Sequence, residues 1–256
     1  PHSAKLQDYP VINKRIFMQH FTDINAYGIS EKDALSVALK AEESRDFSPV
    51  FQTTSGKEIT VGLSSGTSGN RGIFLVSPEE SALWAGYMLK RMLPRPYLAR
   101  HSIAFFLRAN SNLYTAVKSP LIRFEFYDLL ETLDAHIPRL NTQKPTILIA
   151  PAQVLQQLAR HPDLAIHPKK IISVAEVLEP QVKTRIEQRF STPVHQIYQC
   201  TEGFLAHTCA HGNLHLNEDM VYIEKDWIDR ESGRFAPIIT DFNRKSQPVI
   251  RYRLDD

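Results

Sequence analysis

Between residues 101 and 198, short apolar runs of strand type alternate with segments of helical apolar spacing. A helix between two strands returns the chain to the same end of a sheet, so this order predicts mostly parallel strands. The expected strands span 101–107, 121–127, 146–150, 170–175 and 193–198, and the expected helices span about 128–140, 151–160 and 180–190. The middle of the chain is therefore predicted to form layers of helices on a sheet.

Two further regions flank this pattern. From about residue 213 strand-like segments follow one another directly, which predicts a β-rich portion over 213–256 after an α/β core over about 1–212. Near the N-terminus we expect a helix over 30–42 capped by Ser30, strands over 59–63 and 72–77, and a helix from 78 to about 93. The predicted fold class is α/β, with mostly parallel sheets flanked by helices and a β-rich C-terminal portion.

Composition argues against several classes of partner. The net charge is +2 and the charged residues are dispersed, so we expect no nucleic-acid partner and no membrane partner. No apolar run approaches the roughly 20 residues that span a bilayer. Two cysteines do not make a disulfide framework and no signal peptide is visible, so we expect a cytoplasmic protein.

Residues 62–72 read GLSSGTSGNRG and hold four of the ten glycines in the chain. Expected strands lie on both sides, so the stretch is predicted to be a loop between two strands. Glycines let successive backbone N–H groups converge on an anion, and hydroxyl side chains add further donors. The stretch therefore predicts a phosphate-binding loop, weighed against a mobile surface loop without a ligand.

Three other motifs share part of this pattern. A Walker P-loop needs a Gly-Lys-Ser/Thr step and a following helix, and a dinucleotide loop needs glycines that this stretch does not place. The run Gly62–Gly66 satisfies G-x-S-x-G, the nucleophile elbow of serine hydrolases, with Ser64 as the nucleophile. That elbow requires a helix directly after the serine, and the later glycines disfavour one.

The loop over 64–72 closely resembles the S-S-G-T-[ST]-G-x-[PR]-[KG] loop of adenylate-forming enzymes, which include acyl-CoA synthetases, peptide-synthetase adenylation domains and luciferases. Residues 198–202, YQCTE, resemble the Y-G-x-T-E motif of these enzymes, with glutamine in place of glycine. Residues 251–256, RYRLDD, resemble R-Y-R-T-G-D, with leucine and aspartate in place of threonine and glycine. The resemblance implies the fold of the large N-terminal domain of these enzymes.

Shorter matches resemble the phenylacetate–CoA ligase branch. They are YPVINK at 9–14, VAE at 174–176, HLNED at 215–219 and PVIRY at 248–252. The resemblance implies an acid–thiol ligase that activates a carboxylic acid with ATP and Mg²⁺ to acyl-AMP, releasing pyrophosphate. A thiol, of CoA or of a carrier protein, then takes the acyl group.

The resemblance also implies site residues. The nucleotide site would comprise Ser64, Ser65, Gly66, Thr67, Ser68, Gly69, Gly72, Ala175, Glu176, Tyr198 and Asp256, with Arg71, Thr201 and Glu202 as catalytic residues. Thr201 would donate to the α-phosphate and Glu202 would ligate Mg²⁺, for which a carboxylate oxygen is a suitable hard ligand. Tyr198 would stack on adenine, and Asp256 would accept from the ribose hydroxyls.

The acyl pocket of this branch lies near the segment after strand 101–107. There we expect Phe106, Asn110, Asn112 and Tyr114 to contact the substrate. Asparagines beside aromatic residues would suit a polar aryl acid, whereas packing in the core explains the aromatic residues equally well.

A second cluster raises the question of a zinc site, because both cysteines and three histidines lie close together in the sequence. The residues are Cys200, His207, Cys209, His211 and His215. A helix is broken at Gly212, so we expect a hairpin here, which could still gather two or three ligands. Unmetallated side chains remain the favoured alternative.

The ends of the chain suggest a fragment, since it begins at Pro1 without methionine and stops just after a strand-like run. Family members continue with a small C-terminal lid domain, which is absent here, so we expect nucleotide binding without full activity. Two other functions stay open: a nucleotide-binding module without catalysis, and a serine hydrolase that uses Ser64.

Overall fold

The computed structural model describes residues 5–64 and 71–254, and the chain divides into two compact units. The first unit comprises residues 1–81, 200–205 and 217–256, and the second comprises residues 82–199 and 206–216. This division differs from the expected boundary at residue 212. The two ends of the chain lie together in the first unit because they pair directly: Ile12 N–H donates to Arg251 O at 3.0 Å, and Arg253 N–H donates to Ile12 O at 2.8 Å.

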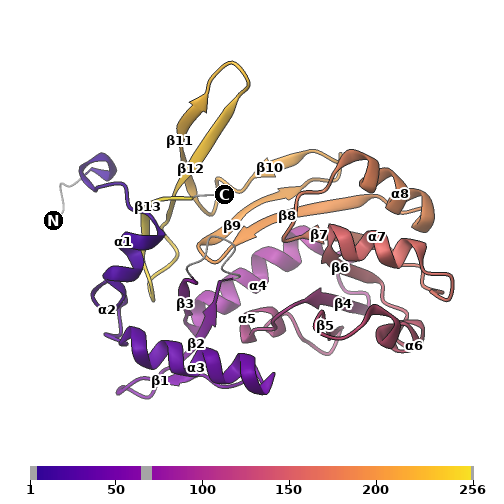
Figure 1. Ribbon diagram of the computed structural model, residues 1–256, viewed down its shortest axis with the longest axis horizontal. Coiled ribbons are helices and arrows are strands. Elements are labelled where there is room, and N and C mark those ends of the chain that lie inside the picture. The colour runs from indigo at the N-terminus through magenta and orange to yellow at the C-terminus, as the bar shows by residue number, and fades with distance from the viewer. Residues whose placement is uncertain (1–4, 65–70, 255–256) are drawn as a thin grey trace. The chain divides into compact units, whose positions relative to one another are not determined.

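Seven strands form the main sheet, in the order β10-β9-β8-β7-β6-β4-β5 (Figure 1). The strands are β4 (His101–Leu107), β5 (Ile122–Asp128), β6 (Ile147–Pro151), β7 (Lys170–Val174), β8 (Val194–Cys200), β9 (Gly203–Thr208) and β10 (Leu214–Leu216). The five from β4 to β8 pair in parallel, whereas β9 and β10 pair antiparallel. The expected α/β architecture is confirmed, although strand β9 was not predicted.

Helices cover both faces of this sheet in the second unit (Figure 1). They are α4 (Pro78–Met92, from residue 82 in this unit), α5 (Asn112–Thr115), α6 (Leu133–Gln143), α7 (Ala152–Arg160) and α8 (Pro180–Phe190). Helix α6 starts later than the expected residue 128. Asp128 instead begins a turn, in which its carboxylate accepts the Leu130 N–H at 2.9 Å, and its backbone carbonyl accepts the Glu131 N–H at 3.1 Å.

The core of the second unit lies between the sheet and helices α6, α7 and α8. Leu148 and Ile171 of the sheet, Leu140 of α6 and Leu155 of α7 are all 0% exposed. Fully burying one such side chain stabilises a protein by about 1.5–3 kcal/mol. Burial of apolar surface is therefore the main force that holds this unit together.

The first unit contains two small antiparallel sheets, β1-β2-β3 and β11-β12-β13. Their strands are β1 (Phe51–Gln52), β2 (Glu58–Leu63), β3 (Ile73–Val76), β11 (Tyr222–Asp229), β12 (Arg234–Asp241) and β13 (Val249–Arg253). The helices are the 3-10 helix η1 (Leu6–Asp8), α1 (Lys14–Gln19), α2 (Phe21–Ile24) and α3 (Glu31–Ser44). As expected, Ser30 caps α3, since its hydroxyl accepts the Asp33 N–H at 3.1 Å.

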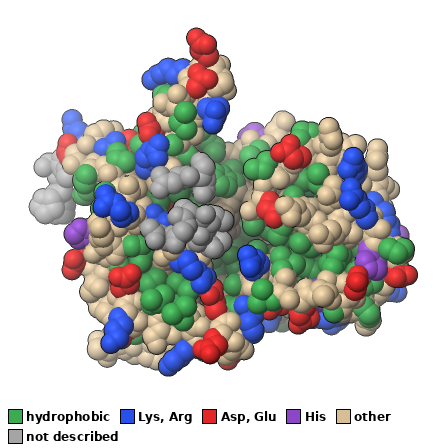
Figure 2. All heavy atoms as spheres, viewed as in Figure 1, with side chains coloured by type: hydrophobic (Ala, Val, Ile, Leu, Met, Phe, Trp, Pro, Cys, Tyr) green, Lys and Arg blue, Asp and Glu red, His purple; other side chains and the backbone are tan. Residues whose placement is uncertain are grey.

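Basic and acidic side chains are interspersed on the face of the molecule shown in Figure 2. Among the described residues, no helix is long and apolar enough to cross a membrane.

Candidate functional site

The glycine-rich stretch joins two strands, as the sequence predicts. β2 and β3 pair antiparallel from Thr60 opposite Val76 to Leu63 opposite Ile73. Two hydrogen bonds close the stem beyond them: Ser64 N–H donates to Gly72 O at 2.8 Å, and Gly72 N–H donates to Ser64 Oγ at 2.7 Å. The loop residues Ser65, Gly66, Thr67, Ser68 and Gly69, with Asn70, lie outside the described residues.

Ser64 belongs to the stem of this loop. It is 9% exposed, and its hydroxyl oxygen accepts from Lys14 Nζ at 3.1 Å as well as from the Gly72 N–H. Lys14 is the first residue of α1, which Asn13 caps by accepting the Ile16 N–H at 3.0 Å. The next described element is strand β3, which pairs antiparallel with β2, whereas the nucleophile elbow of a serine hydrolase leads into a helix.

Two of the glycines are explained by close packing. A Cβ at Gly62 would lie 2.2 Å from the Phe74 ring, its cross-strand neighbour. A Cβ at Gly72 would lie 3.1 Å from Lys14 Cε and 3.6 Å from Ser64 Oγ. Gly72 therefore makes room for the Lys14–Ser64 contact, and its expected role at a phosphate stays a prediction.

Arg71 braces the outside of the same stem. Its Nε–H donates to Ser64 O at 3.1 Å, and its two Nη groups form a bidentate ion pair with the Glu42 carboxylate of α3. Hydrogen bonding to Arg71 lowers the pKa of Glu42, and the same bonds raise the pKa of Arg71. Both Nη groups of Arg71 thus bind Glu42. This arrangement favours a role in supporting the loop stem over the expected contact with phosphate.

Thr201 and Glu202 form the two-residue connection between β8 and β9, so they lie at the tip of a hairpin. Both side chains are half-buried, and Thr201 O accepts from Arg244 Nη1 at 2.8 Å. Burial and the neighbouring Glu202 carboxylate raise the pKa of the Cys200 thiol well above its ordinary value. The motif therefore places one carboxylate beside a thiol with a raised pKa.

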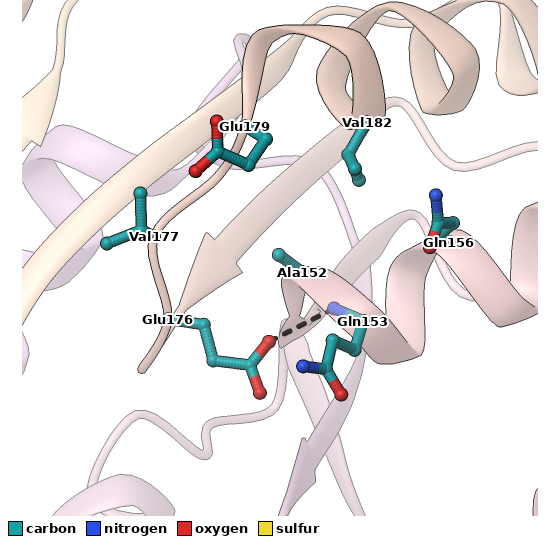
Figure 3. Close-up of a pocket in the computed structure, with 7 residues that line it drawn as sticks. All are labelled: Ala152, Gln153, Gln156, Glu176, Val177, Glu179 and Val182. Atoms are coloured by element: carbon teal, nitrogen blue, oxygen red, sulfur yellow. Dashed lines mark hydrogen bonds between the residues drawn. The ribbon is translucent and has the colours of Figure 1, made fainter.

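The predicted adenine-side residues lie at the carboxyl ends of strands in the second unit. Ala175 directly follows β7 and has a left-handed backbone, with φ of 65°. The next carboxylate, Glu176, accepts the Gln153 N–H at 3.1 Å (Figure 3). Helix α7 has no side-chain cap of its own, so Glu176 supplies both an acceptor and a negative charge at its N-terminus.

A cavity of about 290 Å³ opens beside this contact (Figure 3). Its lining combines amides, carboxylates and small apolar side chains: Ala152, Gln153, Gln156, Glu176, Val177, Glu179 and Val182. Tyr198, the other predicted adenine contact, is half-buried on β8. The site at the ends of the parallel strands follows the general position of ligand sites in α/β sheets.

The residues expected to contact an acyl group separate into two sets. Phe106 faces α6, where it is 0% exposed and stacks on Tyr127 with ring centroids 4.6 Å apart. Phe106 therefore packs in the core of the second unit, and its predicted contact with a substrate gains no support from this position. Tyr114 of α5 lies on the opposite face, against Phe105 at 4.9 Å. Asn110 is half-buried and accepts the Ser111 N–H at 2.9 Å, while Asn112 begins α5.

An aromatic cluster missed at the sequence level surrounds Tyr114. Its ring lies edge-on to Trp84 of α4, with centroids 5.9 Å apart, and burial raises its pKa. The Trp84 indole N–H donates to Gln199 Oε1 at 3.2 Å. Gln199, which replaces the glycine of the Y-G-x-T-E pattern, therefore has a partner in this cluster.

The Cys/His cluster forms the expected hairpin. His207 of β9 lies opposite His215 of β10, and the Cys209 N–H donates to Asn213 O at 2.9 Å. Over the described part of the chain, no group of three His, Cys, Asp or Glu side chains is placed to hold a metal ion. The proposed zinc site of Cys200, His207, Cys209 and His215 thus gains no support from the geometry.

Comparison with known proteins gives one sequence relative and many similar folds. No family model matches the chain. Over 133 residues, 49% of the chain, it is 28% identical to Protein CapK of Staphylococcus aureus, and the match covers 29% of that protein. A structure of 2-hydroxyisobutyryl-CoA ligase in the postadenylation state in complex with R3-HIB-AMP is 16% identical with a TM-score of 0.68. That match covers 96% of this chain and 52% of the ligase.

Two other ligase structures have similar folds. The anthranilate CoA ligase AuaEII in complex with anthranoyl-AMP is 12% identical with a TM-score of 0.54, covering 72% of this chain and 40% of that one. An acyl-CoA synthetase (AMP-forming)/AMP-acid ligase II-like protein from Dyadobacter fermentans is 15% identical with a TM-score of 0.53, covering 89% and 62%. The chain spans about half the length of the 2-hydroxyisobutyryl-CoA ligase. The fold of this chain is thus that of adenylate-forming CoA ligases.

Proposed function

We propose that this chain carries the nucleotide site of an enzyme that activates a carboxylic acid with ATP to acyl-AMP and pyrophosphate. One observation carries the proposal. The stem of the glycine-rich loop and the Thr201–Glu202 turn, both expected to serve the phosphates, belong to the same compact unit. Two motifs 130 residues apart in the sequence are thus built into one hydrogen-bonded body, within a fold shared with acyl-AMP-binding ligases.

The residues of the first unit suit charge neutralisation at phosphates. Glu202 offers oxygen ligands at a half-buried hairpin tip, which suits a hard cation such as Mg²⁺. Bound there, Mg²⁺ would neutralise charge on the leaving pyrophosphate. The hydroxyl of the preceding residue, Thr201, would donate to a phosphate oxygen. Phosphoryl chemistry depends on positioning and charge more than on a protein nucleophile, and a braced loop stem meets that requirement.

The acid is proposed to be aryl or similarly flat. Tyr114, Phe105 and Trp84 form a cluster on the α4 face of the sheet, and aromatic side chains favour offset or edge-on contact with an aromatic ring. Asn110 would supply a polar contact nearby. We further propose a thiol such as that of CoA as the acyl acceptor, and a cytoplasmic location.

Calorimetric titration of the chain with ATP and with AMP, each with Mg²⁺, tests the nucleotide site. We expect both to bind, and Glu202→Ala to weaken MgATP binding at least tenfold while AMP binding changes less than twofold. The control is Glu231→Ala, which removes the same charge from an exposed turn and should leave both affinities unchanged. Absence of binding to the wild-type chain, or equal effects of the two variants, would contradict the proposal.

A further inference from the structure

The segment 243–247, between β12 and β13, is tied to strand β3 by buried side chains. Gln247 is 1% exposed and its amide bonds twice to that strand: Oε1 accepts the Leu75 N–H at 3.0 Å, and Nε2 donates to Ile73 O at 3.1 Å. The Ser246 hydroxyl donates to Leu75 O at 3.0 Å. The segment therefore has a fixed position relative to the strand that follows the glycine-rich loop.

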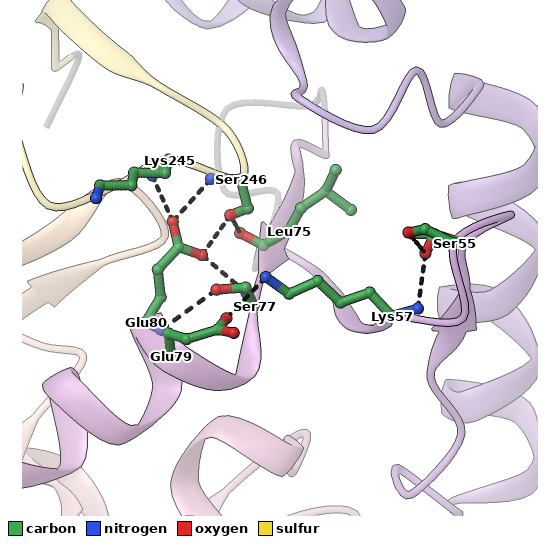
Figure 4. Close-up of polar contacts among 9 residues, drawn as sticks. Ser55, Lys57, Leu75, Ser77, Glu79, Glu80, Lys245 and Ser246 are labelled. Atoms are coloured by element: carbon green, nitrogen blue, oxygen red, sulfur yellow. Dashed lines mark hydrogen bonds and ion pairs between the residues drawn. The ribbon is translucent and has the colours of Figure 1, made fainter.

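The Glu80 carboxylate holds the same segment from the side of α4 (Figure 4). It accepts the backbone N–H groups of Lys245 and Ser246, the latter at 2.8 Å, together with the Ser246 hydroxyl. It also accepts the Ser77 N–H at 2.8 Å, so Ser77 and Glu80 form a reciprocal cap at the start of the helix. Four donors on one carboxylate fix the backbone from which Arg244 projects.

From this backbone, Arg244 reaches two motifs at once. Its Nη1 group donates to Thr201 O at 2.8 Å, and its Nη2 group donates to Leu75 O and to Gln247 Oε1, each at 3.2 Å. We propose that Arg244 is a positioning residue that sets the Thr201–Glu202 turn against strand β3. The proposal rests on the proposed function, because the proposed function gives the Thr201–Glu202 turn its role at the phosphates.

The geometry requires an arginine. A planar guanidinium presents N–H donors in two directions at fixed angles, whereas a lysine ammonium is a single point charge on a flexible stem. A further donor, Arg244 Nε–H, is buried and has no partner in the described part of the chain. An unsatisfied buried donor costs about 1–3 kcal/mol. Such a cost is typical of a side chain retained for functional geometry rather than for stability.

Arg244 would affect the chemistry by fixing the position of the Glu202 carboxylate. A displacement of about 1 Å at a reacting group can cost about a hundredfold in rate. With Arg244 removed, the hairpin tip would lose its only described tie to the segment 243–247, and Glu202 would no longer be held at one distance from the loop stem.

The test measures amide hydrogen exchange and nucleotide affinity in Arg244→Gln. We expect faster exchange in peptides covering residues 198–205, unchanged exchange in β4 and β5, and about tenfold weaker MgATP binding with AMP affinity changed less than twofold. Arg244→Lys should give an intermediate effect on MgATP. Lys245→Gln is the matched control, since it removes the same charge from the exposed neighbouring side chain and should match the wild type.

Each result has one meaning. Unchanged exchange at 198–205, or faster exchange with unchanged MgATP affinity, would overturn the proposal, as would an equal effect of Lys245→Gln. Loss of protection in β4 and β5 as well would show that Arg244→Gln unfolds generally. The MgATP affinity of Arg244→Lys would then test the proposal, and an affinity equal to that of the wild type would overturn it. A wild-type chain that binds no MgATP would overturn the proposed function instead, while the exchange data would still show whether Arg244 restrains the turn.

Discussion

Both compact units have an apolar core, but the first unit also has buried polar contacts between segments far apart in the sequence. In the second unit, apolar side chains such as Leu148 and Leu155 are 0% exposed between the sheet and its helices. The first unit also has apolar residues such as Leu75 at 0% exposure, and it adds buried polar residues that link distant segments: Ser246 is 0% exposed, Gln247 is 1% exposed and Ser64 is 9% exposed. Apolar burial tolerates small shifts, whereas hydrogen bonds specify direction. The residues proposed to bind phosphates thus lie in the unit whose distant segments are held by directional hydrogen bonds.

The largest effect is expected from the apolar core. Leu155→Ala should lower the free energy of unfolding by about 3 kcal/mol through lost burial and a residual cavity. The loss should be the same from pH 7 to pH 5, because no charge is involved. Chemical denaturation at both pH values measures it. Leu98→Ala is the control, because Leu98 is 83% exposed and should change stability by less than about 0.5 kcal/mol.

A smaller effect is expected at the hairpin of the first unit. Gly62→Ala should destabilise the chain by about 2 kcal/mol, because the added Cβ would lie 2.2 Å from the Phe74 ring, which has to move. Gly86→Ala, in open space on α4, should instead stabilise it by about 0.5–1 kcal/mol. Thermal denaturation of both variants gives the comparison. Equal shifts in the two variants would remove the packing explanation for Gly62.

The smallest effect is expected from the half-buried Glu80 carboxylate, and it alone depends on pH. Burial by itself would raise the pKa of Glu80, but hydrogen bonds from Ser246, Ser77 and Lys245 lower it below its ordinary value of 4.5. A lowered value in the folded state means that the ionised form stabilises the protein above about pH 4.5 and that this contribution declines as the pH falls further. Glu80→Gln should therefore cost about 1.5 kcal/mol at pH 7.

The difference between wild type and Glu80→Gln should shrink between pH 4.5 and pH 3. Denaturant titrations of both proteins at several pH values measure this difference. The difference is more informative than the wild-type curve, because burial raises the pKa of Asp241 and this group contributes with the opposite sign. A difference that stays constant down to pH 3 would contradict the role given to the ionised carboxylate.

Much of the fold was predictable because it depends on local periodicity. Strand β4 and helix α8 have the expected bounds, and the loop between β2 and β3 lies where its glycines place it. The start of α6 was wrong because a single Asp128 side chain begins a turn there. The grouping of both ends of the chain in one unit was not predicted, because contacts such as that of Gln247 with Leu75 join residues 172 apart and have no periodic signature.

In the candidate site, too, local features were predictable from the sequence and long-range side-chain contacts were not. Thr201 and Glu202 directly follow strand β8, which the sequence predicted over 193–198. The side chains that contact the motifs were not predicted, because Lys14 reaches Ser64, Trp84 reaches Gln199 and Arg244 reaches Thr201 from distant segments. For Phe106 the sequence left the orientation open, because strand residues alternate faces and the motif does not determine whether the odd or the even residues of β4 face a pocket.

The hydrogen bond from Trp84 to Gln199 gives the chain an optical reporter. Only two tryptophans are present, and the other, Trp227, lies on the β11–β12 hairpin. The emission maximum of an indole depends on its hydrogen bonding and on nearby water. Because Gln199 lies inside the motif expected to meet the nucleotide, any ligand that moves β8 would change the fluorescence of Trp84 without a label.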